Sequence, residues 1–158
     1  MDSVKMEARS RNMASIKNKN TKPEIVIRKL LHKHGFRFRI HDSKLPGRPD
    51  IVLAKYRVCI LVNGCFWHRH LNCKYATSPK TRVEFWENKF RNNVIRDNIN
   101  KQLLVDKGWK LIELWTCGIT NNESELLWIL HEIITPGRNL ISWPEIEPIN
   151  QTNNHSLE

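Results

Sequence analysis

The sequence has no apolar run long enough to span a bilayer, and its first residues, MDSVKMEARSRNM, lack the apolar middle segment of a signal peptide. These absences argue against a membrane protein and against a secreted one, so we expect a cytoplasmic chain with no membrane partner. Internal repeats are absent as well, which excludes a repeat protein. With 158 residues and 40% hydrophobic side chains, the chain suits one domain with its own core.

Acidic residues are also few for a chain of this length. Asp and Glu number 16 against 26 Lys and Arg, which gives a formal net charge of +10. Nucleic acid is the commonest partner of such a chain, because each Lys or Arg beside a phosphate releases a condensed counterion. A basic, soluble protein without a nucleic-acid partner is the alternative, and charge alone does not separate DNA from RNA.

The chain has four cysteines, and because we expect it to be cytoplasmic, where thiols stay reduced, a disulfide framework is not expected. Cys59 lies in the apolar run YRVCILV, and we interpret it as a small buried hydrophobic residue. This leaves Cys65, Cys73 and Cys117 for another role.

The apolar pattern predicts an α/β domain with a mixed central sheet flanked by helices. Helices are expected over residues 21–35, 82–107 and 122–135, and strands over residues 36–41, 51–54, 56–64 and 109–115. Two capping boxes, Thr21 with Glu24 and Thr81 with Glu84, mark the starts of the first two helices. We divide the chain into a basic arm at residues 1–20, a folded domain at residues 21–137 and a polar, flexible tail at residues 138–158.

The stretch LVNGCFWHRHLNC contains two cysteines and two histidines within thirteen residues. Together with the distant Cys117, three of these residues offer the ligand set of a tetrahedral structural zinc site: Cys65, His70 and Cys73. Four protein ligands leave no open coordination position, so such a zinc ion would not activate water. Unrelated buried cysteines and a surface histidine are the alternative.

His68 is not needed for that site, because two histidines would compete for one position, and a merely structural or exposed histidine is its simplest interpretation. Asp50 follows the connector KLPGRPD and begins an apolar strand, and Pro49 is expected to bias Arg48 towards an extended conformation. A carboxylate at a sheet edge could hold Mg²⁺, a hard cation that prefers oxygen. An Asp that only caps a turn is the alternative.

Five segments in order, PGRPDIVL, NGCFWHRH, KTRVEFW, NVIRD and GWKLIELWTC, resemble the Vsr family of very-short-patch repair endonucleases. The resemblance runs from about Arg9 to Cys117. It implies a restriction-endonuclease-like fold with an embedded structural zinc site, in which the domain at residues 21–137 is a Mg²⁺-dependent endonuclease. It further implies nicking of one strand of double-stranded DNA, 5′ to the thymine of a T:G mismatch left by deaminated 5-methylcytosine. A cytosine-5 DNA methyltransferase is the implied functional companion, and we expect a bacterial monomer.

The resemblance also implies roles for single residues. Asp50 would bind Mg²⁺, Glu24 would hold metal-bound water, His68 would be the base and Asp97 would orient it. Cys65, His70, Cys73 and Cys117 would bind zinc. The residues expected at DNA are the aromatic wedge, the helix residues facing the duplex and one residue of the arm: Phe66, Trp67, Trp86, Lys89, Asn93 and Met13. Without the resemblance, Asp97 could equally be a surface charge paired with Arg96 or Lys101, and Trp67 and Trp86 could be core residues.

The sequence departs from the usual nuclease pattern at two points. No Asp-x-Lys or Glu-x-Lys follows Asp50 on the next strand, and His68 stands in for that base. Asn63 lies where relatives often have a histidine that assists at the metal, and an amide can hydrogen-bond metal-bound water but cannot titrate near neutral pH. Two other functions therefore stay open: a zinc-stabilised DNA-binding module without catalysis, and a restriction-type nuclease that cuts matched duplex.

Overall fold

Five strands form one mixed sheet in the order β1-β2-β3-β4-β5. The fold is described for residues 19–149 in a computed structural model. The strands are β1 (Arg39–Ile40), β2 (Ile51–Leu53), β3 (Val58–Asn63), β4 (Lys110–Trp115) and β5 (Leu140–Trp143). Pairing is antiparallel from β1 to β3 and parallel from β3 to β5. Met13 and most of the expected arm lie outside the described residues.

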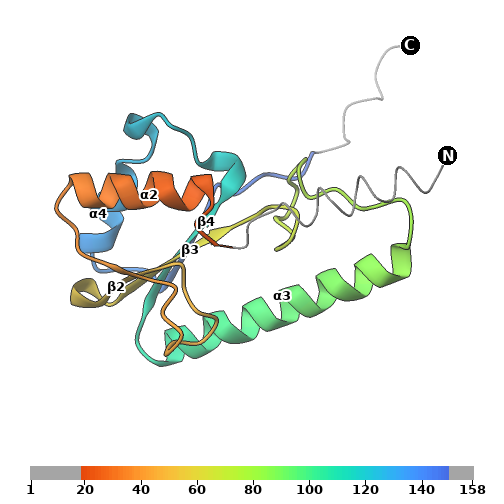
Figure 1. Ribbon diagram of the computed structural model, residues 1–158, viewed down its shortest axis with the longest axis horizontal. Coiled ribbons are helices and arrows are strands. Elements are labelled where there is room, and N and C mark those ends of the chain that lie inside the picture. Colours follow the sequence, from red (N-terminus) through yellow and green to blue (C-terminus); the bar gives the residue numbers. More distant parts are fainter. Residues whose placement is uncertain (1–18, 150–158) are drawn as a thin grey trace, which may run out of the picture.

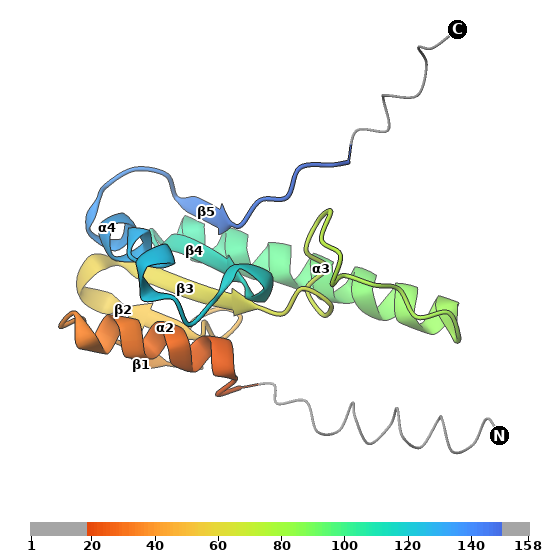
Figure 2. The same cartoon turned by 90° about the horizontal axis from the view of Figure 1, so that it is seen from above.

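Within residues 19–149, three helices cover the two faces of this sheet. They are α2 (Lys22–Lys33), α3 (Val83–Asp106) and α4 (Trp128–Ile134), and short 3-10 turns lie at Ala54–Tyr56, Thr116–Gly118 and Glu123–Glu125. Helices α2 and α4 lie over one face, and α3 runs along the other (Figures 1 and 2). The mixed α/β architecture expected from the sequence is confirmed; the finer expectation of a restriction-endonuclease-like fold stays a prediction.

The core follows from the alternation of side chains along the strands. Ile51 and Leu53 of β2 pack with α2 and α4, whereas Val52 between them packs with Leu104 of α3. Because successive side chains of a strand point to opposite faces, the short apolar run fills both layers. Cys59 on β3 is fully buried beside Trp109, as expected of a small hydrophobic residue.

Strand β5 corrects the expected domain boundary. The chain from Arg138 onwards was expected to be irregular, but residues 140–143 pair in parallel with β4 from Leu111 to Leu114. Its apolar residues are too few to show a strand by their pattern alone. The sheet therefore extends past residue 137, and of the expected tail only residues 150–158 lie outside the described part.

Several local expectations are also wrong. The strand expected over residues 36–41 is only Arg39–Ile40, and the last helix is shorter than expected, at Trp128–Ile134. Helix α3 begins after Arg82, whose backbone is left-handed and whose side chain does not cap the helix, so the N-cap lies one residue later than the expected Thr81. Within residues 19–149, no helix is long and apolar enough to cross a membrane.

Candidate active site

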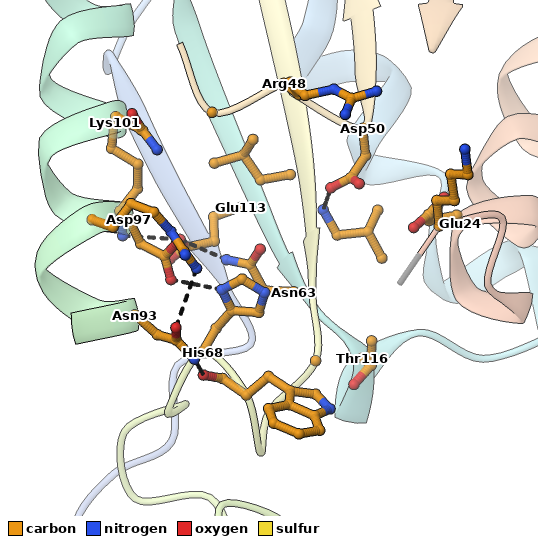
Figure 3. Close-up of a pocket in the computed structure, with 18 of the residues that line it drawn as sticks. Glu24, Arg48, Asp50, Asn63, His68, Asn93, Asp97, Lys101, Glu113 and Thr116 are labelled. Atoms are coloured by element: carbon orange, nitrogen blue, oxygen red, sulfur yellow. Dashed lines mark hydrogen bonds and ion pairs between the residues drawn. The ribbon is translucent and has the colours of Figure 1, made fainter. Parts of the chain in front are cut away.

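A cleft of about 860 Å³ lies where β2 begins and β3 ends, between the first turn of α2 and the middle of α3. It brings together the side chains expected to be catalytic, namely Glu24, Asp50, Asn63, His68 and Asp97. Figure 3 shows Asp50 towards Glu24 on one side of the cleft, and His68 with Asp97 on the side of α3. These residues come from four separate segments of the chain.

The turn before β2 sets the position of Asp50. Gly47 has φ +72°, and a Cβ there would lie 3.0 Å from Cβ of Asn100 on α3, so only glycine lets the turn pass this close to the helix. Arg48 also has a positive φ, of 48°, so the extended conformation expected before Pro49 is wrong. The turn thus bends sharply and delivers Asp50 to the edge of the sheet.

The Asp50 carboxylate is held by the neighbouring strand. Its Oδ2 accepts a hydrogen bond of 2.8 Å from the Val62 N–H of β3. Burial raises the pKa of Asp50 to about 6, and the nearby Glu24 carboxylate adds to this, while the Val62 hydrogen bond opposes it. A buried carboxylate that is hard to ionise gains from a neighbouring cation, which is the electrostatic situation of a metal ligand.

Glu24 lies in the first turn of α2 and is buried. Thr21 caps the helix by accepting from the Glu24 N–H, which confirms half of the expected capping box. The Glu24 carboxylate accepts instead from the Asn20 N–H at 2.9 Å and forms an ion pair of 2.8 Å with Arg28. The Asn20 N–H before the helix and Arg28 one turn further along it therefore fix the Glu24 carboxylate at the cleft.

His68 and Asp97 form the closest polar pair of the cleft. Nδ1 of His68 lies 2.6 Å from Oδ2 of Asp97, and both side chains are partly exposed. The two alternative partners considered for Asp97 have other contacts: Lys101 pairs with Glu113 on β4, and Arg96 donates to Asn93. With Nδ1 bound to the carboxylate, Nε2 is the nitrogen left to exchange a proton.

Asn63 belongs to a buried polar network behind the cleft. Its Nδ2 donates to Oε2 of Glu113 at 3.0 Å, and Lys101 Nζ donates to the same oxygen at 3.0 Å. Oε1 of Glu113 accepts from Ser142 on β5 at 2.9 Å. Because a carboxylate only accepts, it fixes the Asn63 amide with its nitrogen towards Glu113, and Figure 3 shows the amide oxygen on the side of Asp50.

Beyond the cleft lies a group of four side chains that could hold a metal ion, called here the metal cluster: Cys65, His70, Cys73 and Cys117. One potential ligand atom from each lies within 4.8 Å of all the others. Nδ1 of His70 is 3.6 Å from the Cys65 sulfur and 3.4 Å from the Cys117 sulfur. Burial raises the pKa of Cys117 to about 12, so this thiol ionises only when a cation replaces its proton. Three thiols and an imidazole converging in this way fit a tetrahedral metal ion.

The segment after β5 decides which nitrogen of His70 faces the sulfurs. Nε2 of His70 lies 2.7 Å from the Pro144 carbonyl oxygen, which can only accept. Nε2 therefore carries the proton and Nδ1 presents its lone pair to the cluster. Asn72 donates to the Ile146 carbonyl at 2.9 Å, and Gly118 admits Pro144 so closely that a Cβ would lie 2.6 Å from its ring.

A cluster of aromatic rings lies beside the cleft, and Trp67 of this cluster lines it. Phe66 packs against Trp67, Trp86 and Phe90 with ring centroids 5.0, 5.9 and 5.1 Å away. Phe66, Trp67 and Trp86 are half-buried, so they combine mutual packing with an open face. Lys89 Nζ lies 5.7 Å from the Trp67 ring. Asn93 donates to the Trp67 carbonyl and accepts from Arg96, so its amide is engaged at both ends.

Known proteins resemble this chain over most of its length. The sequence model of the family described as DNA mismatch endonuclease Vsr matches residues 1–75. The type II nicking enzyme V.XorIIP of Xanthomonas oryzae pv. oryzae is 39% identical over 120 residues, which are 76% of this chain and 88% of the relative. The DNA mismatch endonuclease Vsr of Escherichia coli is 41% identical over 115 residues, 73% of each chain. V.NmeAIP of Neisseria meningitidis, another type II nicking enzyme, is 42% identical over 113 residues, 72% of this chain and 80% of the relative.

The chain belongs to the Vsr family. The resemblance in the sequence is thereby confirmed, and the enzyme class that follows is an endonuclease. Each of these relatives matches more than two thirds of the chain, so membership of the family rests on similarity over most of the sequence.

Two cleft residues of this Vsr family member were not expected from the sequence. His41 lies 3.2 Å from Glu24, and Glu113 anchors Asn63 and Lys101. No sequence pattern marks either residue as part of the site, because His41 follows a strand of only two residues and Glu113 is a single acidic residue in an apolar strand. The nearest indication of Glu113 is its place in KLIELW, where a lone carboxylate needs a buried partner.

Proposed function

We propose that this protein nicks one strand of double-stranded DNA 5′ to the thymine of a T:G mismatch that arises from deaminated 5-methylcytosine. The observation that carries the proposal is that Asp50 and His68, from separate segments, line one cleft in a chain of the Vsr family. We place the enzyme in the bacterial cytoplasm as a monomer, with a cytosine-5 DNA methyltransferase as functional companion.

Asp50 would bind the catalytic Mg²⁺, since carboxylate oxygens are the donors that this ion prefers, and Glu24 beside it would hold water bound to the ion. When bound, the ion supplies Lewis-acid stabilisation of the charge on the scissile phosphate. Glu24 acts from the buried first turn of α2, where Arg28 and the Asn20 N–H fix its direction. Asn63 presents its amide oxygen towards Asp50 and can accept a hydrogen bond from water there.

His68 would be the general base. Asp97 binds Nδ1 and so leaves Nε2 to accept a proton from the attacking water, and assistance of this kind is worth about 10² to 10⁴ in rate. The imidazolium that forms is stabilised by the Asp97 carboxylate at 2.6 Å.

The metal cluster would hold Zn²⁺ and contribute to catalysis by fixing the position of His68. His68 lies between the two cluster ligands Cys65 and His70, so pinning those residues fixes the loop that carries the base. A catalytic group needs placement to about 0.5 Å, which a free loop does not give. Zinc with four protein ligands supplies no open position, so its part is structural.

Phe66, Trp67 and Trp86 would wedge beside the mismatch. Inserting rings between bases costs a few kcal/mol of unstacking, and the cost is smallest at a mispaired step, which contributes selectivity. Lys89 beside Trp67 would meet a phosphate of the opened strand. Asn93 would support this wedge by holding the Trp67 backbone, and a direct contact to a base edge needs its amide to leave Trp67 and Arg96. The N-terminal arm with Met13 would reach the other groove.

A strand-specific cleavage assay tests the proposal. Zinc-loaded protein with Mg²⁺ is expected to nick a T:G duplex 5′ to the thymine in a preferred flanking sequence, and to leave T:A and C:G duplexes intact. Asp50→Ala is expected to abolish nicking and retain binding. Binding without nicking by the wild-type protein would indicate a DNA-binding module, and cleavage of both strands of matched duplex would indicate a restriction-type nuclease.

A further inference from the structure

His41 lies between the two carboxylates of the cleft and has no part in the proposed nicking chemistry. Its Nε2 is 3.2 Å from Oε2 of Glu24 and 3.9 Å from Oδ1 of Asp50. One potential ligand atom from each of these three residues lies within 4.8 Å of both others. Imidazole and two carboxylates thus converge from three separate segments at one end of the cleft.

These separations match the edges of a coordination shell. With metal–ligand bonds of about 2.1 Å, neighbouring donors of an octahedral ion lie about 3.0 Å apart and opposite donors about 4.2 Å apart. The separations of His41 from Glu24 and Asp50 lie in this interval. Three protein donors at such distances can bind one ion after small side-chain shifts.

The backbone holds His41 in register with Asp50. The His41 N–H donates to the carbonyl oxygen of Asp50 itself at 3.3 Å, so any movement of one residue is coupled to the other. His41 has φ +45°, a left-handed conformation that is uncommon outside glycine, asparagine and aspartate. Its side chain is only 15% exposed. The imidazole is therefore fixed at the cleft and not a surface group that visits it.

Arg28 shapes which cation suits these donors. Its Nη2 is 2.8 Å from Oε2 of Glu24, so one of the two carboxylate charges is already neutralised by the protein. Mg²⁺ is held mainly by carboxylates and water, so neutralising one carboxylate lowers the affinity of the cleft for this ion. A first-row transition-metal dication also bonds to neutral imidazole and depends less on the missing charge.

We propose that His41 and Glu24 bind directly to the cation that Asp50 holds, so that His41 is its third protein ligand, and that this cleft prefers a first-row transition-metal dication, with Mn²⁺ as the probe, over Mg²⁺. The proposal rests on the proposed function, since it concerns the same metal site. It makes His41 the residue that sets metal preference in this chain.

Pulsed electron paramagnetic resonance of Mn²⁺ bound to the zinc-loaded, DNA-free protein tests the ligand directly, because an imidazole nitrogen bonded to Mn²⁺ modulates the echo. We expect this nitrogen modulation in the wild-type protein, its loss in His41→Gln, and its persistence in His68→Ala, which removes the other imidazole of the cleft. His34→Gln is the matched control, since His34 pairs with Glu123 away from the cleft.

Calorimetric titration gives the preference. We expect Mn²⁺ to bind the wild-type protein at least about tenfold more tightly than Mg²⁺. His41→Gln is expected to lower the affinity for Mn²⁺ by about tenfold and to change the affinity for Mg²⁺ by less than about twofold, because a carboxamide oxygen suits Mg²⁺. The proposal is overturned if Mn²⁺ binding depends on Asp50 but shows no nitrogen modulation from His41 and is no tighter than Mg²⁺ binding. That result leaves the proposed function standing. Absence of Mn²⁺ and Mg²⁺ binding at Asp50 overturns both.

Discussion

Nδ1 of His68 on the loop after β3 lies 2.6 Å from Oδ2 of Asp97 on α3, a contact between residues 29 positions apart in the sequence. The carboxylate fixes the ring so that Nε2 faces the cleft containing Asp50. The pair couples the loop after β3, which carries three of the cluster ligands, to helix α3, so the direction of the base depends on both.

Removing the imidazole is expected to abolish most of the rate without unfolding the protein. His68→Ala should lower the nicking rate constant by about 10² to 10⁴ and retain bound zinc, because His68 is not a cluster ligand. Asp97→Asn should lower it by about 10² or more, since an amide can donate to Nδ1 and so stabilise the wrong tautomer. Single-turnover kinetics on a T:G duplex measure both. Asp106→Asn, an exposed carboxylate on the same helix, is the control, and zinc loss in His68→Ala would show that the two histidines have exchanged roles.

Loss of one thiol from the metal cluster should unfold the loop that carries His68. Cys117→Ser is expected to bind less than one zinc per chain and to melt at a lower temperature, because zinc-binding free energy contributes to folding. Elemental analysis and thermal melting measure this. Cys59→Ala is the control, since Cys59 is buried in a separate apolar cluster. Full zinc content and activity in Cys117→Ser would remove Cys117 from the ligand set.

The raised pKa of Asp50 predicts a pH-dependent stability change. Below about pH 4 the carboxyl is protonated in both the folded and unfolded states; between its ordinary value of 3.8 and about 6 only the folded state retains the proton, so folded stability falls as the pH rises through this window. At pH 8 without divalent cations, Asp50→Asn should therefore be more stable than wild type, by up to about 3 kcal/mol, and the difference should vanish near pH 4.

Urea denaturation at pH 4 and pH 8 measures this difference. The amide oxygen introduced by Asp50→Asn can still accept from the Val62 N–H, so the hydrogen bond is retained and the charge alone changes. Adding Mg²⁺ or Mn²⁺ at pH 8 should stabilise the wild-type protein and leave Asp50→Asn unchanged. A variant that is less stable than wild type at pH 8 without metal would contradict the raised pKa.

The segment after β5 is expected to slow the release of zinc from the metal cluster. Truncation after Trp143 removes the Pro144 carbonyl that orients His70 and the Ile146 contact to Asn72, while β5 stays intact. Because such outer contacts are worth about 10- to 100-fold in metal affinity, zinc should pass to a chelator about tenfold faster or more. Truncation after Ile149 keeps both contacts and is the control. Equal release rates from the two proteins would show that this segment does not hold the cluster ligand.

The buried Glu113 should be worth far more than a surface ion pair. Glu113→Ala leaves the Lys101 ammonium and the Asn63 amide without their buried acceptor, and should cost about 3 kcal/mol or more in the free energy of unfolding. Glu132→Ala is the matched control, because Lys110 keeps two backbone carbonyl partners, and it should cost less than about 1 kcal/mol. Urea denaturation compares the two, and similar costs would mean that the Glu113 network is not a buried charged unit.

Much of the fold was predictable because its signals are local. The apolar runs of β2, β3 and β4, the stops of α2 and α3 at glycine, and the tight connection around Lys55 all follow from neighbouring residues. Strand β5 and the short β1 were not, because a strand of two to four residues has too few alternations to be recognised. The start of α3 was placed one residue too early, because Arg82 has a left-handed backbone that no sequence rule favours.

The sequence by itself determined the donor chemistry. Thiols and imidazole at close spacing favour a tetrahedral metal, a carboxylate after PGRP favours a hard cation, and ordered motifs indicate the family. Only the tertiary structure decided that His41 stands between Glu24 and Asp50, that Glu113 orients Asn63, and that the Pro144 carbonyl selects Nδ1 of His70. The physical reason is that residue type fixes what an atom can bond to, whereas which atoms meet depends on strand pairing and helix packing between segments far apart in the chain.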